Sequence, residues 1–263
     1  MALTAEGSRL TEANRVNQLR IAAQASVVAN ALWSRLDPAK LDASSPAWLA
    51  ANVATAQTFY GRSADATAQY VERYRLAEIG PNVEPIVFPE FDSAYMSEAL
   101  LVAGPVRVKL LAGRGMTGAK AHSEGKRKFL GIMRRQVLSG GRQLIDETTG
   151  ADSQAIGWRR KSDGNPCAFC AMLCSRGPVY RSADKAGDPT AGSGLRYHGH
   201  CGCTAEIVYG EWQPTQQEQG FIDDYERAAQ EANDAGFART QESVLPRLRA
   251  NGAFRDSPIS RNK

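Results

Sequence analysis

The chain has 263 residues and a formal net charge of +4, with 43% hydrophobic and 23% charged residues. This composition is typical of a globular protein and excludes a fibrous or wholly disordered chain. No stretch approaches the roughly 18 consecutive apolar residues that a membrane span needs. Charged residues run through the first twenty positions, where a secretory signal would have an apolar core. We therefore expect a protein without a membrane partner that folds in a reducing cytoplasm.

The first part of the chain predicts helices. Apolar residues recur at helical spacing over 12–36. Ser45-Pro46 is typical of an N-cap followed by proline in the first helical turn, so a second helix is expected to begin there. Gly61 is expected to break that helix, and Ser63 to start a third one.

Three prolines within 81–90 predict an extended segment. Residues 91–111 are expected to be helical, with a kink at Gly104-Pro105. A basic helix is predicted over 120–137, and Gly140-Gly141 is expected to interrupt it. The predicted buried stripe of this basic helix consists of Phe129, Ile132, Met133 and Val137.

Positive charge is concentrated between Arg107 and Arg142, which hold ten basic residues and a single acid, Glu124. Such a block favours a polyanion or an acidic protein surface as partner, although a solvated helix face explains it equally well. The candidate nucleic-acid-binding residues are Lys126, Arg127, Lys128, Arg134 and Arg135. Contacts of this type would be non-specific, because phosphate contacts alone do not read bases.

The character of the sequence changes near Gly150. Short β-type runs occur at Val179-Tyr180 and over 204–209, and residues 184–194 have the composition of a mobile loop. A helix is predicted over 216–235, and 252–263 is expected to be a disordered tail.

These elements predict an α+β protein that is mainly α. We expect a helical platform over 1–150, a small β-containing zinc-knuckle region over 151–212, and a helical extension with a flexible tail over 213–263.

The cysteines carry the sharpest signal, because all five lie between Cys167 and Cys203. Disulfides are improbable in a reducing compartment, so clustered cysteines indicate a metal or catalysis. Cys167 and Cys170 form a Cys-x-x-Cys pair, and a His-x-x-Cys-x-Cys motif follows about thirty residues later. Together they supply the soft donors that tetrahedral Zn²⁺ requires. The candidate metal ligands are Cys167, Cys170, His198, Cys201 and Cys203.

Within that set, Cys167, Cys170, His198 and Cys201 are favoured, with Cys203 and His200 as reserves, because alternate residues of an extended segment point in opposite directions. Cys174 is interpreted as a buried thiol. A site closed by protein ligands would be structural, so we predict structural zinc and assign no catalytic residue. Free cysteines buried without a metal are the alternative.

The two motifs carry a family resemblance. The runs 157–180 and 197–209 resemble the MuF-type head-morphogenesis family of tailed bacteriophages, which has a Cys-x-x-Cys, a short strand after a glycine and a downstream His-Pro-Asn-Cys-Arg-Cys. The five candidate ligands match the positions of that motif. The chain departs from it with Gly199-His200 in place of Pro-Asn and Gly202 in place of Arg. The helical first half is similar to the version found in phages of actinobacteria.

This resemblance implies a minor capsid protein at the portal vertex that assists head assembly and DNA packaging or delivery. Its implied partners are the portal protein, the scaffold and major capsid proteins, and non-specific DNA. Its implied location is the virion interior, after assembly in the host cytoplasm.

Two enzymatic alternatives remain open. Some actinobacteriophage relatives are described as capsid maturation proteases, and Ser123 or Ser139 could serve as nucleophile with His122 or His200 as base. In the other alternative, His122-Ser123-Glu124 and the later Pro-Cys-x-x-Cys match the pattern of a zinc-dependent deaminase. That pattern leaves the second half of the cysteine cluster unexplained.

Overall fold

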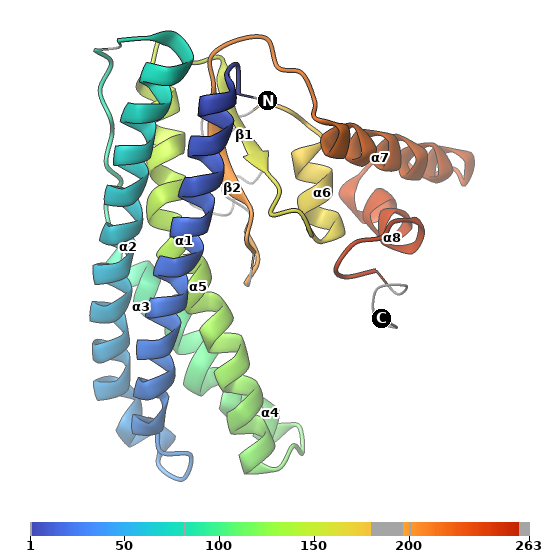
Figure 1. Ribbon diagram of the computed structural model, residues 1–263. Helices are drawn as coiled ribbons and strands as arrows, with labels where there is room; N and C mark the ends of the chain where they lie inside the picture. Colours follow the sequence, from blue (N-terminus) through green and yellow to red (C-terminus); the bar gives the residue numbers. More distant parts are fainter. Residues whose placement is uncertain (1, 82, 180–196, 200, 258–263) are drawn as a thin grey trace.

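A computed structural model describes residues 2–81, 83–179, 197–199 and 201–257. Three long helices lie side by side as a bundle, a two-stranded sheet lies beside it, and a smaller group of helices projects from the sheet (Figure 1). The protein is therefore α+β and mainly α, as predicted. None of the helices in these ranges has both the length and the apolar character needed to cross a membrane.

The helical elements are α1 (Ala5–Leu32), a 3₁₀ turn (Trp33–Arg35), α2 (Leu41–Ile79), α3 (Ser93–Leu101), a π turn η2 (Val102–Val106), α4 (Arg107–Gly113), α5 (Gly118–Ala151), α6 (Ala168–Cys174), α7 (Gln216–Asp234) and α8 (Gln241–Asn251). The strands are β1 (Gly157–Lys161) and β2 (Thr204–Val208).

Helix α2 is continuous over 39 residues, so the predicted start at Ser45 and the predicted break at Gly61 are wrong. Pro46 is the sixth residue of α2, so it lacks the N–H that would otherwise donate to the carbonyl of Asp42, and the helix continues with one hydrogen bond fewer. Glycine costs about 1 kcal/mol in a helix interior. Packing of α2 against α1 and α5 outweighs that cost.

The predicted interruption at Gly140-Gly141 is also wrong, because both glycines lie within α5. They allow α5 and α2 to touch. A Cβ atom at Gly140 would lie 2.2 Å from the carbonyl oxygen of Tyr60, and one at Gly141 would lie 2.3 Å from Oγ1 of Thr67. The backbone N–H of Gly141 also donates to Oγ of Ser63 across this contact, at 3.0 Å.

The predicted kink at Gly104-Pro105 is confirmed. Gly104 has φ −97° and ψ −105° within η2, and a Cβ atom there would lie 2.6 Å from the ring of Trp48. The predicted stripe of α5 is buried at Phe129, Met133 and Val137 and partly buried at Ile132. The kinked segment and the first half of α5 thus enclose an aromatic core.

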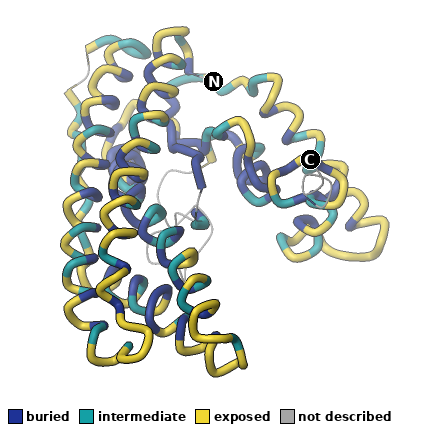
Figure 2. The backbone as a smooth tube through the Cα atoms, turned by 60° about the horizontal axis from the view of Figure 1, so that its bottom comes forward, coloured by how far each residue is buried: buried dark blue, intermediate teal, exposed yellow. Residues whose placement is uncertain are grey.

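The sheet is antiparallel, with Gly157 opposite Val208 and Lys161 opposite Thr204. Both strands are almost wholly buried between the bundle and the projecting helices (Figure 2). The strand at 204–208 confirms the predicted β run, whereas β1 was not predicted. Val179 lies in no strand, and Tyr180 falls outside the described residues, as do 184–194.

A buried ion-pair network ties the sheet to α7. Arg159 of β1 donates to Glu206 of β2 at 2.7 Å and also pairs with Glu218 of α7. Glu218 in turn closes a capping box with Thr215 at the beginning of α7. One guanidinium therefore pairs with two carboxylates in the interior and links both strands to α7.

The prediction of a disordered tail from Gly252 is wrong for the part that the structure describes. Phe254 is 3% exposed and packs with α6, α7 and α8. The backbone N–H of Arg255 donates to the carbonyl of Pro166 at 3.1 Å, and Asp256 accepts from the N–H of Ala168 at 2.7 Å. The C-terminal segment is thus fastened to the start of α6.

The hydrophobic clusters cross the predicted domain boundaries. One cluster joins Leu10, Tyr74 and Leu144 of the bundle to Trp158 and Ile207 of the sheet. Another joins α6 to α7 and α8. The division at 150 and 212 stays a prediction about separable folding units.

Two glycine substitutions test the packing of α5 on α2. Gly140→Ala should lower the free energy of unfolding by about 1–3 kcal/mol, because its methyl group overlaps the backbone of Tyr60. Gly61→Ala is the matched control, since a Cβ atom there meets nothing within 4 Å. It should stabilise the chain by about 0.5–1 kcal/mol through helix propensity. Urea unfolding would measure both, and a shift of the same sign in the two variants would contradict this packing.

Candidate metal centre

The antiparallel register brings the two cysteine motifs together. β1 ends at Lys161, shortly before Cys167, and its partner Thr204 directly follows Cys203. Cys167 is the N-cap of α6, where its Sγ accepts from the backbone N–H of Cys170 at 3.4 Å. One strand pairing therefore places the beginning of α6 beside the segment that enters β2.

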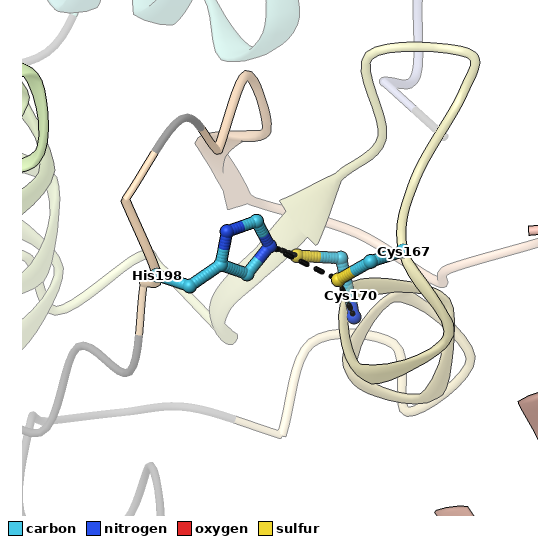
Figure 3. Close-up of side chains that lie close together, drawn as sticks. All are labelled: Cys167, Cys170 and His198. Atoms are coloured by element: carbon cyan, nitrogen blue, oxygen red, sulfur yellow. Dashed lines mark hydrogen bonds between the residues drawn. The ribbon is translucent and has the colours of Figure 1, made fainter. Parts of the chain in front are cut away.

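All five predicted ligands lie in one cluster. Sγ of Cys167 lies 3.0 Å from Nε2 of His198, and Sγ of Cys170 lies 3.4 Å from the same atom (Figure 3). Sγ of Cys170 is also 3.5 Å from Sγ of Cys201. The donor atoms form two triplets, one with Cys167, Cys170 and His198, and one with Cys170, Cys201 and Cys203. Within each triplet they lie within 4.8 Å of one another.

Cys170 belongs to both triplets, and all four of these cysteines are buried. His198 is partly exposed, and its Nδ1 lies 2.7 Å from the carbonyl oxygen of Gly199. An Nδ1–H that donates to this carbonyl leaves the lone pair of Nε2 directed at the sulfurs, which is the usual arrangement of a metal-ligating histidine. The cluster can therefore hold a metal ion.

The thiols differ in how readily they lose a proton. Hydrogen bonds with Cys170 and then His198 lower the pKa of Cys167 to about 5, against the effect of burial. The hydrogen bond with Cys167 raises the pKa of His198. Hydrogen bonds with Cys170 and Cys203 and the charges of two arginines lower the pKa of Cys201.

The other two thiols resist ionisation. Hydrogen bonds with Cys167, Cys201 and Cys203, together with burial, raise the pKa of Cys170. The hydrogen bond with Cys170 lowers the pKa of Cys203, but those with Cys174 and Cys201 and burial outweigh it. Thiolates crowded in a low-dielectric interior repel one another. Only a nearby cation allows all of them to ionise.

Two buried arginines supply part of that positive charge. The guanidinium groups of Arg142 and Arg160 lie over the ring of Tyr197, at 3.6 and 3.7 Å from its centroid. Arg142 of α5 donates to the carbonyls of Cys201 at 3.2 Å and Cys203 at 2.9 Å. Nη1 of Arg160, on β1, donates to Sγ of Cys170 at 3.8 Å.

Sequence reasoning missed this arginine–tyrosine stack. Arg142 was assigned only to the basic stretch, and no role was predicted for Tyr197. A tyrosine directly before the ligating histidine was the only available signal, because the approach of Arg142 and Arg160 depends on tertiary structure. Cys174 is buried in the core of α6–α8 and belongs to neither triplet, while His200 lies outside the described residues.

The five candidate nucleic-acid-binding residues do not share one face. Arg127 and Lys128 are exposed, Lys126 is partly exposed, and Arg127 pairs with Glu124. Arg135 donates to the hydroxyl of Tyr95 at 3.3 Å.

Arg134 differs from the other four. Arg134 is partly buried, and burial and then the charge of Arg142 lower its pKa. The exposed basic surface is therefore carried by Lys126, Arg127 and Lys128.

His122 and Ser139, which the enzymatic alternatives would use, make their hydrogen bonds away from the cysteines. Nδ1 of His122 accepts from Nε1 of Trp33 at 3.3 Å, and the two rings lie 5.0 Å apart. Within the described part of the chain, His122 joins neither metal triplet. Oγ of Ser139 donates to the carbonyl of Arg135 at 3.1 Å, within its own helix. The His-x-Glu pattern of a deaminase is therefore not brought to the Cys-x-x-Cys pair.

Comparison with known proteins gives one family and one relative. A family model described as "VG15 protein" matches residues 5–232. The "Gene 15 protein" of Mycobacterium phage D29 is 36% identical over 80 residues, which cover 29% of this chain and 29% of that relative. No solved structure matches.

Removal of Cys170 tests the metal centre most sharply, because it belongs to both triplets. We expect the purified chain to carry about one equivalent of zinc, and Cys170→Ser to lose it. The same variant should unfold at lower temperature, because the binding free energy of a structural metal adds to folding free energy. Elemental analysis and thermal unfolding measure the two effects.

His122→Ala is the control for this experiment, since His122 contacts Trp33 rather than the cysteines. It should keep its metal. A Cys170→Ser variant that retains full metal content, or a His122→Ala variant that loses it, would contradict this assignment of the site.

Proposed function

We propose that this chain, which belongs to the VG15 family, is a virion-associated head protein of a tailed bacteriophage. The family match over most of the chain carries the proposal, and the similarity to a protein of Mycobacterium phage D29 supports it. The finer role is that of a MuF-like minor capsid protein near the portal vertex. That role rests on the Cys-x-x-Cys and His-x-x-Cys-x-Cys motifs.

The proposed role includes structural zinc. The donor set of thiolates and an imidazole suits Zn²⁺, and its burial suits a closed site. Cys167, Cys170 and His198 would hold the ion together with a sulfur from Cys201 or Cys203. Bound zinc would supply a cross-link between α6 and the segment before β2, and the positive charge that lets the thiols ionise.

The surroundings fit this charge balance. Three thiolates and one neutral imidazole on Zn²⁺ carry one excess negative charge. Arg142 and Arg160 lie where they would offset it, because Arg142 donates to the carbonyls of Cys201 and Cys203 and Arg160 contacts the sulfur of Cys170. Their burial would be costly without an anionic partner. This arrangement favours a metal that fastens the fold over one that performs chemistry.

The proposed partners follow from the basic surface. Lys126, Arg127 and Lys128 offer positive charge to packaged DNA or to an acidic portal surface, and scaffold and major capsid proteins remain candidate neighbours. In this proposal the chain assembles in the host cytoplasm and remains inside the capsid.

Purified virions test the proposed function. Quantitative mass spectrometry of particles should find this chain at a small fraction of the copy number of the major capsid protein. Antibody labelling of opened heads should place it at the portal vertex. A chain that is present in infected cells but missing from particles at all stages of assembly would contradict the proposal.

The DNA contact has a separate test. Replacing Lys126, Arg127 and Lys128 by Glu should abolish salt-sensitive retention on DNA, because the phosphate contacts that release counterions are lost. The control replaces Arg20, Arg62 and Arg73 by Glu, which are exposed residues outside the basic stretch, and gives the same change in net charge. Affinity would be measured over a salt series. Equal losses in the two triple variants would mean that net charge, and not this surface, governs DNA binding.

A further inference from the structure

A groove of about 560 Å³ lies between the kinked segment α3–η2–α4 and helix α5. It is distant in sequence from the metal ligands and shares no lining residue with them. Its apolar side chains include Tyr95 of α3, Val102 and Val106 of η2, Leu110 of α4 and Ile132 of α5. The groove is open to the surface and mainly apolar.

The apolar side chains of this groove are unusually exposed. Tyr95 is 45% exposed, Val102 54%, and Val106 and Leu110 are each 43% exposed. Val102, Val106 and Leu110 follow one another at intervals of four residues, so they form a stripe along the segment. A contiguous exposed apolar surface of this kind marks an interaction site more often than chance exposure.

The kink gives the groove its shape. Gly104 packs its backbone against Trp48, whose ring leaves no space for a Cβ atom. That contact holds η2 against the core and turns Val102 and Val106 outward. Nη2 of Arg135 spans from α5 to the hydroxyl of Tyr95 on α3, at 3.3 Å.

The charged side chains of the groove are mostly basic. Arg107, Lys128 and Arg135 line it, and Glu98 is the acidic residue among its lining. A partner that covers the apolar stripe would meet these three cations at its margins. Electrostatic complementarity therefore favours a partner with acidic residues on either side of an apolar strip.

We propose that this groove binds an acidic amphipathic helix of a partner protein. Apolar residues at intervals of three and four on that helix would lie on Val102, Val106 and Leu110. Its flanking carboxylates would reach Arg107, Lys128 and Arg135. This is the helix-in-groove mode of recognition, in which apolar anchors supply affinity and flanking charges supply orientation.

A second copy of this chain fits the groove poorly. A symmetric contact would oppose the three cations of one groove to those of the other. The chain does contain an acidic amphipathic helix, α7, but its apolar residues Phe221, Ala228 and Ala232 are buried against α6 and α8. DNA also fits poorly, because phosphates would face an apolar floor.

The test uses a synthetic probe and the full chain. A fluorescein-labelled helical peptide of about four turns, with leucines at intervals of three and four and glutamates on both flanks, is titrated by fluorescence anisotropy. A scrambled peptide of the same composition serves as the control probe. We expect the helical peptide to bind and the scrambled one to bind at least about tenfold more weakly, a difference of about 1.4 kcal/mol.

Substitutions locate the binding to the groove. Val106→Asp and the milder Val102→Ser should each weaken binding of the peptide, and Lys128→Glu should weaken it more at low salt than at high salt. Val27→Asp is the control, because Val27 is 70% exposed on α1, away from the groove. Circular dichroism would confirm that each variant keeps its helical content.

Three results would overturn the proposal. These are no binding of the helical peptide at millimolar concentration, equal binding of the scrambled peptide, and undiminished binding by both Val106→Asp and Val102→Ser. Sedimentation adds a fourth. A dimer of the wild-type chain that Val106→Asp dissociates would assign the groove to self-association.

Discussion

The crowding of thiols around Cys170 is the constraint on which the rest of the structure depends. Four buried sulfurs and an imidazole lie close together, and the thiolates among them would repel one another in this buried site. Arg142 and Arg160 relieve part of this repulsion, and each comes from a different element. Because those elements are α5 and β1, the electrostatics of the cluster connect the bundle to the sheet. A divalent metal would complete that balance.

Helix α5 connects the regions that carry the proposed functions. Its first half supplies exposed cations and one wall of the apolar groove. Its second half packs on α2 through Gly140 and Gly141, and its Arg142 reaches the carbonyls that precede β2. One helix thus connects the proposed partner surface to the buried cluster of cysteines and histidine. On the far side of that cluster, α6 and the segment around Asp256 hold the projecting C-terminal helices.

The sequence predicted features that depend on local chemistry and missed those that depend on tertiary contact. Cys-x-x-Cys and His-x-x-Cys-x-Cys have recognisable metal-ligand spacings, so the five residues could be named before their positions were known. The kink at Gly104-Pro105 and the buried stripe of α5 follow from local rules as well.

Gly140 was misinterpreted because glycine has the same local signal whether it breaks a helix or allows two helices to pack closely, and Gly61 because the packing of α2 outweighs the cost of one glycine. At Gly140 the deciding atom is the carbonyl oxygen of Tyr60, eighty positions away in the chain. The stack of Arg142, Tyr197 and Arg160 was missed because these residues are also far apart in the sequence. Phe254 was assigned to a disordered tail because its hydrophobic partners lie on α6, α7 and α8. Long-range contacts of this kind leave no periodic trace in the sequence.

X-ray absorption spectroscopy at the zinc edge of the purified full chain tests the central claim most directly. A single zinc ion bound by Cys170 and its neighbours predicts a first coordination shell of sulfur atoms and one nitrogen, with zinc–sulfur distances of about 2.3 Å. The Cys170→Ser variant should lose this signal, and His122→Ala should keep it. A first shell made only of nitrogen and oxygen, or a sulfur shell that persists without Cys170, would contradict the account.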